Sequence, residues 1–174
     1  KQEDAYNHIK KNFGAHKPVL LHGVTGSGKT EVYVQLIKDT LAINKQVLYL
    51  IPEIALTTQL ITRLRAVFGE IVGVYHSRFS ENERVETWNN ILGIKGTGNK
   101  IKDDSKQFRI ILGARSGLFM PFTDLGLVIV DEEHDSSFKQ IDPAPRYHAR
   151  DLAIVLAKTH QANVLLGSAT PSVE

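Results

Sequence analysis

The sequence has no cysteine, no long apolar run and almost no excess of either charge. Without cysteine, the chain forms no disulfide bond and offers no thiolate ligand to a metal ion. No apolar run approaches the length of a membrane span, and the opening residues, KQEDAYNHIKK, do not resemble a signal peptide. The formal net charge of +2 is too small to indicate a nucleic-acid partner by itself. Function must therefore be sought in local motifs.

The chain has 174 residues, 42% of them apolar and 23% charged, as in one globular domain with a substantial core. Short apolar segments alternate with segments that repeat apolar residues at helical spacing. This alternation predicts an α/β domain with a doubly wound parallel sheet and helices on both faces. Strands are expected at residues 19–21, 46–51, 71–75, 109–112, 125–130 and 163–166, and helices at 1–13, after 30, at 56–68, after 80 and at 148–159.

Several segments carry expectations about burial. The apolar strand at residues 19–21 is predicted to be buried, and that at 46–51 to be covered on both faces. Residues 93–107, GIKGTGNKIKDDSKQ, are nearly free of apolar side chains and predict an exposed, flexible insertion, whose lysines either contact DNA or are simply solvated. The core stripe of the helix at 56–68 is expected to include Val67, and a capping box at Ser80 is expected to open a helix that carries Val85, Trp88 and Ile91.

A glycine-rich loop follows the first predicted strand and precedes a helix. Its sequence, GVTGSGKT, has the spacing G-x-x-x-x-G-K-T of a phosphate-binding loop. Glycine permits the positive φ angles that direct backbone N–H groups at phosphate oxygens, and the helix N-terminus adds partial positive charge. The expected nucleotide contacts are Gly23, Thr25, Gly26, Ser27, Gly28, Lys29 and Thr30, with the Thr30 hydroxyl suited to Mg²⁺.

Polar residues also follow two other predicted strands. Asp131 and Glu132 come directly after the strand at 125–130, where one carboxylate can hold Mg²⁺ and the next can activate water. Taken alone, such acids also fit a solvated loop, and the phosphate loop favours the catalytic interpretation. Ser168 and Thr170, in GSATP after the last strand, fit either a relay that senses the terminal phosphate or a plain turn.

The order of GVTGSGKT, PEIALTTQ, DEEH and GSAT resembles the first motor lobe of superfamily 2 helicases of the DExH type. With DEEHDSSFKQ, RYHARDLA and GSATPS, the sequence more narrowly resembles the PriA family of replication-restart helicases. The resemblance implies a RecA-like fold, ATP and Mg²⁺ as cofactors, and an ATP-dependent 3′-to-5′ DNA helicase that acts at stalled forks in primosome assembly. The alternatives are another superfamily 2 DNA translocase, or a nucleic-acid-binding module with a structural nucleotide site.

The resemblance also implies roles for individual residues. Lys29, Asp131 and Glu132 match catalytic positions, Thr30 and Asp131 match magnesium ligands, and Gln2 matches a glutamine that reads adenine. The loop at 135–150 matches an aromatic-rich segment that couples DNA binding to hydrolysis, although its aromatics also fit simple packing onto the domain. Expected DNA contacts are Thr57, Arg115, Ser116, Phe138, Lys139, Arg146, Tyr147 and Arg150, and expected coupling residues are His134, Ser168 and Thr170.

The family has further parts that this sequence does not match: a second motor lobe, a zinc module and an N-terminal DNA-binding region. The chain by itself is therefore expected to be nearly inactive, and zinc is expected only in the full-length protein. The resemblance further implies a bacterial cytoplasmic monomer at the nucleoid, with no membrane contact. Its expected partners are single-stranded and forked DNA, single-stranded-DNA-binding protein and other primosome proteins.

Overall fold

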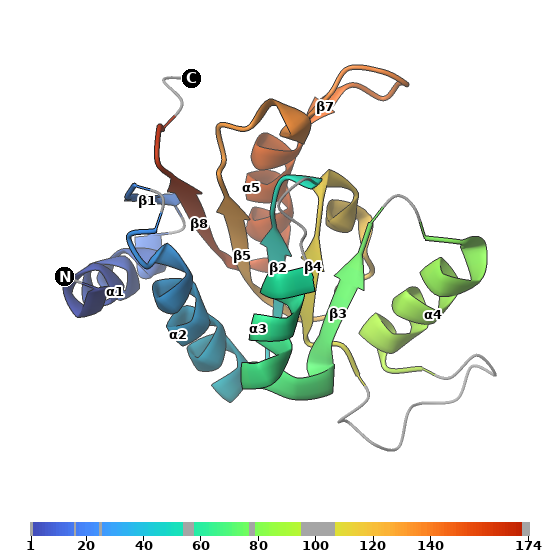
Figure 1. Ribbon diagram of the computed structural model, residues 1–174, viewed down its shortest axis with the longest axis horizontal. Coiled ribbons are helices and arrows are strands. Elements are labelled where there is room, and N and C mark those ends of the chain that lie inside the picture. The colour runs from blue at the N-terminus through green and yellow to red at the C-terminus, as the bar shows by residue number, and fades with distance from the viewer. Residues whose placement is uncertain are drawn as a thin grey trace.

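The structure is a computed structural model that describes residues 2–15, 17–24, 26–53, 58–76, 79–94 and 107–171. Its centre is a six-stranded sheet with the strand order β1-β8-β5-β2-β4-β3 (Figure 1). Every neighbouring pair is parallel, which confirms the predicted α/β fold. The six strands are β1 (Val19–His22), β2 (Gln46–Leu50), β3 (Val72–Tyr75), β4 (Ile110–Gly113), β5 (Leu125–Asp131) and β8 (Asn163–Ser168).

Helices cover both faces of this sheet (Figure 1). One face packs against α1 (Gln2–Asn12), α2 (Lys29–Ala42) and α3 (Thr58–Phe68). The other face packs against α4 (Glu81–Leu92) and α5 (Ala149–His160). Shorter elements are the 3₁₀ helices η1 (Phe13–Ala15), η3 (Gly69–Ile71), η5 (Arg115–Phe119) and η6 (Ser136–Phe138), and the hairpin strands β6 (Lys139–Gln140) and β7 (Tyr147–His148).

The central strands are apolar because helices cover them on both sides. All five residues of β2 are buried, as predicted, and alternate side chains enter the two core clusters. In β5 the first six residues are buried, and the burial ends at Asp131. Helix α5 buries Ala149, Ala153 and Ala157, whose small side chains on one helix face allow a close approach to the sheet. The core therefore fixes the carboxyl end of β5, from which Asp131 emerges.

Two predictions about burial are wrong. Strand β1 is at the edge of the sheet and its residues alternate between partly buried and exposed, because a short apolar run does not reveal whether a strand has neighbours on both sides. Val67 of α3, expected in a core stripe, is exposed. In α4, Val85 and Trp88 are exposed, and the helix buries only Thr87 and Ile91. The capping box is confirmed: Ser80 accepts from the Glu83 N–H, and Glu83 accepts from the Ser80 N–H.

Gly93 and Ile94 complete the C-terminal cap of α4, and Gln107 donates from its side chain to the Ile91 carbonyl oxygen. The rest of the predicted insertion, residues 95–106, lies outside the described residues. Within the part of the chain that the structure describes, no helix is both long and apolar enough to cross a bilayer.

The strand order brings three segments that are distant in sequence together at the carboxyl ends of the strands. Because β5, β8 and β1 are neighbours and parallel, the segments after their carboxyl ends lie together. Two backbone hydrogen bonds join them: the Gly23 N–H donates to the Ser168 carbonyl oxygen and the Glu133 N–H donates to the Gly167 carbonyl oxygen, both at 3.0 Å. The glycine loop, the acidic turn and the GSAT segment thus form one structural unit.

Candidate functional site

The glycine loop has the geometry of an anion cradle. Gly26 and Gly28 have φ angles of 78° and 86°, in the left-handed region that side chains disfavour. Helix α2 begins directly afterwards, and no side chain caps its N-terminus. No side chain therefore competes with phosphate oxygens at this helix start, where the helix dipole favours an anion. Thr25, expected in this loop, lies outside the described residues.

Lys29 connects the glycine loop to the acidic turn. Its buried ammonium donates to the Gly23 carbonyl oxygen at 2.9 Å and to Glu132 Oε1 at 3.1 Å. The charged hydrogen bond to Glu132 joins residues 103 positions apart in the sequence. The structure thus brings together two residues that the sequence assigned to catalysis.

Two buried tyrosines hold the carboxylate of Asp131. Tyr33 of α2 donates to Oδ1 at 2.8 Å, and Tyr49 of β2 donates to Oδ2 at 3.2 Å. Burial raises the pKa of Asp131 and the nearby Glu132 charge adds to this, while the Tyr33 hydrogen bond opposes it. Gly167 makes the arrangement possible, because a Cβ there would lie 1.9 Å from the Tyr33 hydroxyl. Sequence reasoning missed both tyrosines.

Glu132 adopts a backbone conformation that is uncommon for residues with a side chain. Its φ is 51°, and its N–H donates to Asp131 Oδ1 at 3.1 Å. This turn directs the Asp131 and Glu132 carboxylates into the same cavity. A strained backbone conformation that places a reactive side chain is a common feature of functional sites.

The expected coupling residues form a connected chain. His134 Nδ1 lies 2.8 Å from the Ser168 hydroxyl oxygen, which also accepts from the Thr170 N–H at 3.1 Å. His134 Nδ1 is 3.9 Å from Glu132 Oε2. The Ser168 side chain is fully buried, so this contact is part of the packed domain. The acidic turn and the GSAT segment are therefore in direct contact.

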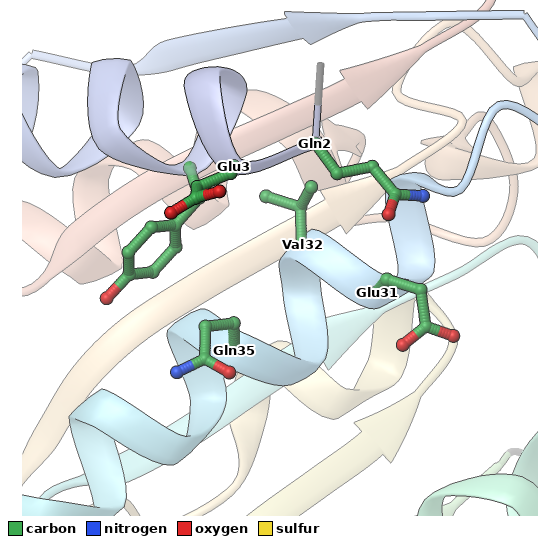
Figure 2. A pocket seen from close by; sticks show the side chains of 6 residues that line it. Gln2, Glu3, Glu31, Val32 and Gln35 are labelled. Carbon is green, nitrogen blue, oxygen red and sulfur yellow. The ribbon is translucent and has the colours of Figure 1, made fainter.

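Two adjoining cavities lie at this edge. The first, of about 400 Å³, contains the phosphate-loop and acidic-turn residues, and Glu31 belongs to both. The second, of about 420 Å³, lies between α1 and α2, whose side chains face one another across it (Figure 2). Gln2 belongs to the second cavity and lies so close to Gly28 that a Cβ there would be 1.9 Å from its amide nitrogen. Gln2 thus lies beside the phosphate loop, and its adenine contact stays a prediction.

The donor set of the first cavity fits a magnesium ion that arrives with its nucleotide. Thr30 and Asp131 both line the cavity, and Asp131 Oδ2, which accepts from Tyr49, has a further lone pair for a metal ion. Among the described residues, no three His, Cys, Asp or Glu side chains cluster as a complete metal cage. Mg²⁺ typically uses one or two protein oxygens together with phosphates and water, so these residues suit it.

The predicted DNA-binding loop needs correction at Phe138. Its side chain is 0% exposed and belongs to the core under α5, so no base can stack on it in this conformation. Phe119 of η5 is instead 52% exposed and lies edge-on to Tyr147, with ring centroids 5.5 Å apart. Sequence reasoning did not single out Phe119, which directly follows the loop at 113–118. Among the described residues from η5 to β7, the accessible aromatic surface is therefore the exposed Phe119 with the half-buried Tyr147.

Arg150 and Ser116 also differ from the prediction. The Arg150 side chain is only 12% exposed and bonds the buried Glu133 at 3.2 Å and Asp151 at 2.9 Å. Arg150 thus attaches α5 to the acidic turn and does not present its charge to DNA. The Ser116 hydroxyl is buried, without a hydrogen-bond partner in the described part of the chain, and does not reach the surface.

The other expected DNA contacts have mixed placements. Arg115 donates to the carbonyl oxygens of Ser137 and Lys139, both at 3.2 Å, and so ties η5 to the following loop. The side chains of Lys139 and Arg146 are exposed, as a phosphate contact requires. Thr57 lies outside the described residues.

Relatives of known name share this sequence over nearly its whole length. The chain is 45% identical over 175 residues to the replication restart protein PriA of Bacillus subtilis, covering 99% of this chain and 20% of that protein. It is 51% identical over 161 residues to PriA of Synechocystis, covering 92% of this chain and 18% of the relative. These relatives confirm the resemblance to PriA. The chain spans about a fifth of their length.

Solved structures share the fold. RecG bound to a three-way DNA junction aligns with a TM-score of 0.65 at 24% identity, over 98% of this chain and 20% of that chain. A SWI2/SNF2 ATPase core from Sulfolobus solfataricus in complex with double-stranded DNA aligns with a TM-score of 0.57 at 14% identity, over 98% of this chain and 31% of that chain. The likeness to RecG agrees with the predicted RecA-like lobe. The sequence profile of the DEAD/DEAH box helicases matches residues 1–174, and the chain belongs to the DEAD/DEAH box helicase family.

Proposed function

We propose that this chain is the ATP-binding lobe of a DNA helicase that acts in replication restart. The single observation that carries the proposal is the bond between Lys29 and Glu132 across a cavity that also contains Thr30 and Asp131. A structural nucleotide site needs the phosphate cradle alone. Here a candidate base, a candidate metal ligand and a phosphate-binding lysine line the same cavity, as hydrolysis requires.

In the proposed mechanism, the triphosphate lies over the glycine loop with its β- and γ-phosphates near Lys29. Backbone N–H groups at the start of α2 stabilise the phosphate charge at no reorganisation cost. Bound Mg²⁺, near Thr30 and Asp131, supplies further neutralisation of that charge. The hydroxyls of Tyr33 and Tyr49 keep the Asp131 carboxylate oriented toward the cavity.

Glu132 is proposed to orient and deprotonate the attacking water. In the structure its carboxylate is paired with Lys29, and this ion pair engages Glu132 Oε1. A triphosphate competes for the Lys29 ammonium, and this exchange releases Glu132 for water. Lys29 then contributes twice, first by restraining the base and afterwards by binding phosphate.

We propose that hydrolysis is communicated to DNA through the His134–Ser168–Thr170 contacts. His134 lies two residues from the candidate base, and Ser168 ends β8. A shift of Glu132 during the cycle would move His134, and with it the GSAT segment. These hydrogen bonds are directional and meet at the buried Ser168, so they can have two discrete arrangements.

The proposed DNA surface is centred on Phe119 and Tyr147. Exposed aromatic rings bind unpaired bases without sequence preference, and Lys139 and Arg146 add phosphate contacts nearby in the loop. Segment 52–59 remains a proposed contact to the phosphate backbone of DNA. Its residues 54–57 lie outside the described residues. The PriA relatives support DNA replication restart as the setting. We extend the proposal to action at the bacterial nucleoid with single-stranded-DNA-binding protein and primosome proteins.

The test is ATP hydrolysis by the full-length protein, with Mg²⁺ and with or without single-stranded or forked DNA. Lys29→Ala and Glu132→Gln should each lower DNA-stimulated turnover by about 100-fold or more, since each removes a transition-state contact. Glu132→Gln should still bind ATP, whereas Lys29→Ala should bind it weakly. Removal of Mg²⁺ with a chelator should abolish turnover.

Two outcomes would contradict the proposal. If DNA does not stimulate turnover, the motor interpretation is wrong and a structural nucleotide site replaces it. If Glu132→Gln hydrolyses ATP at the normal rate, another residue is the base. Glu133→Gln is an unsuitable control because Glu133 is bonded to Arg150; Glu70→Gln, at an exposed position in η3, is a matched one.

A further inference from the structure

Arg63 lines the first cavity, together with its partner Glu31, but the proposed mechanism does not use either side chain. The cavity is lined by Gly26, Gly28, Lys29, Thr30, Glu31, Arg63, Asp131 and Glu132. Most of these residues come from the glycine loop, the start of α2 or the end of β5. Arg63 comes from the middle of α3, a helix whose other contacts are with the core and with β3. Arg63 nevertheless lines the cavity that the phosphate loop lines.

The charges in this cavity are unbalanced for an anionic ligand. Glu31, Asp131 and Glu132 supply three carboxylates, whereas Lys29 and Arg63 are the cations among the described lining residues. The Lys29 ammonium is buried and already donates to Gly23 and Glu132. A triphosphate brings further negative charge, so a second cation near its terminal phosphate would offset repulsion that Lys29 alone leaves.

Arg63 is held near the loop by a contact that can be exchanged. Its guanidinium donates to Glu31, which follows Thr30 in the first turn of α2. The side chains of Arg63 and Glu31 are 51% and 54% exposed, and ion pairs this exposed contribute little stability. A phosphate accepts the guanidinium in bidentate geometry and carries more charge than a carboxylate. Phosphate would therefore compete successfully with Glu31.

We propose that Arg63 is a second cationic ligand for the terminal phosphate, held by Glu31 until a nucleoside triphosphate enters. The inference rests on the proposed function of the same cavity. It has a consequence for coupling, because α3 begins at Thr58, within the proposed DNA-binding segment 52–59. When Arg63 leaves Glu31 for phosphate, α3 becomes directly bonded to the nucleotide, and the start of this helix registers whether the terminal phosphate is present.

The experiment compares binding of a non-hydrolysable ATP analogue and of ADP to the full-length protein with Mg²⁺, by fluorescence titration. Arg63→Ala should weaken binding of the analogue by about tenfold or more, while ADP binding changes by less than about threefold, because ADP lacks the terminal phosphate. Arg63→Lys should be intermediate, since it keeps the charge and loses the planar fork. Glu31→Gln should tighten analogue binding by a few-fold, because it frees Arg63.

Arg65→Ala is the matched control. Arg65 is another exposed arginine of α3, but it points to the Val72 carbonyl oxygen and does not line this cavity. Its substitution should leave both affinities unchanged. The melting temperature of Arg63→Ala should also stay near that of the unaltered protein, because the lost ion pair is exposed.

The inference is overturned if Arg63→Ala binds the analogue as tightly as the unaltered protein. It is also overturned if analogue and ADP weaken equally while the melting temperature falls, which is the behaviour of a purely structural pair between α2 and α3. Lys29→Ala distinguishes failure of the Arg63 inference from failure of the proposed function. If the unaltered protein binds no nucleotide, or Lys29→Ala binds it normally, the proposed function itself fails.

Discussion

Two regions of the molecule come after the carboxyl ends of strands. The positions of their side chains were predicted with very different success. At the nucleotide edge, Lys29, Asp131 and Glu132 line one cavity as their motifs implied. In the loop region from η5 to β7, Phe138 is buried and Arg150 is bonded to Glu133, although both were expected to face DNA. In both regions the residue types suggested a function. Only at the nucleotide edge did they also predict correctly where the side chains point.

The difference comes from what fixes each side chain. At the nucleotide edge the backbone fixes it, because a strand end, a glycine turn and a helix start leave few directions open. In the loop region, tertiary packing decides. Two phenylalanines lie 19 positions apart in the sequence; the core under α5 accommodates Phe138 and leaves Phe119 half exposed. Composition alone cannot distinguish an anchoring ring from a stacking ring.

The largest expected effect is a loss of stability, which tests the contrast between Phe138 and Phe119. Phe138→Ala should lower the free energy of unfolding by about 3–5 kcal/mol, because it removes a fully buried ring and leaves a cavity. Phe119→Ala should lower it by about 1 kcal/mol or less, the worth of an exposed edge-on ring pair. Urea denaturation of this chain, followed by circular dichroism, measures both.

If the two variants lost equal stability, the assignment of Phe138 as the anchor and Phe119 as the surface ring would be wrong. Phe138→Leu provides a milder companion variant, which keeps an apolar side chain in the core. It should retain most of the stability that Phe138→Ala loses.

Much of the fold could be predicted from the sequence, because strand and helix periodicities depend on residue type at regular spacing. The failures have physical reasons. An apolar run at residues 19–21 did not reveal that β1 has a neighbour on one side only. Tyr33 and Tyr49 read as ordinary core residues, since nothing local shows that the Tyr33 hydroxyl reaches a carboxylate 98 positions later. Such partners depend on strand order, which the sequence pattern leaves open.

The second prediction tests the same pair of rings by DNA binding. In the full-length protein, Phe119→Ala should weaken binding of single-stranded DNA by about 1–3 kcal/mol, or roughly fivefold to a hundredfold, if a base stacks on this ring. Phe119→Trp should bind at least as well as the unaltered protein, because it keeps an aromatic face. Fluorescence anisotropy with a labelled oligonucleotide measures the affinity.

Arg146→Ala and Arg150→Ala provide a charge comparison in the same assay. Arg146 is exposed, so its loss should weaken DNA binding and lower the salt dependence. Arg150 is mostly buried, so its loss should instead destabilise the domain by leaving Glu133 without this partner. Unchanged binding by Phe119→Ala together with weakened binding by the still-folded Phe138→Leu would reverse the assignment of the two rings.

The smallest expected effect concerns the attachment of α1 to α2, beside the nucleotide edge. Helix α1, which carries Gln2, is fastened to α2 by Asp39, whose carboxylate accepts from Tyr6 and from Lys10 at 2.7 Å. Burial raises the pKa of Asp39, but the Lys10 and Tyr6 hydrogen bonds outweigh it, and the net pKa lies below its usual value. These side chains are partly exposed, so the network should contribute only about 1 kcal/mol.

A carboxyl group whose pKa is lowered by folding stabilises the protein above its unfolded pKa, near 4, and loses that contribution as the pH falls through the folded value. Asp39→Asn should therefore cost about 1 kcal/mol at pH 7, and the difference from the unaltered protein should vanish once the pH has fallen below the lowered folded pKa of Asp39. Denaturation at a series of pH values measures it. Asp124→Asn is the control, because that carboxylate is more exposed and lies 3.6 Å from its lysine. If the Asp39→Asn difference persisted unchanged in acid, packing would fasten α1 to α2, and the Gln2 side of the nucleotide edge would be as firmly fixed as Lys29 and Asp131.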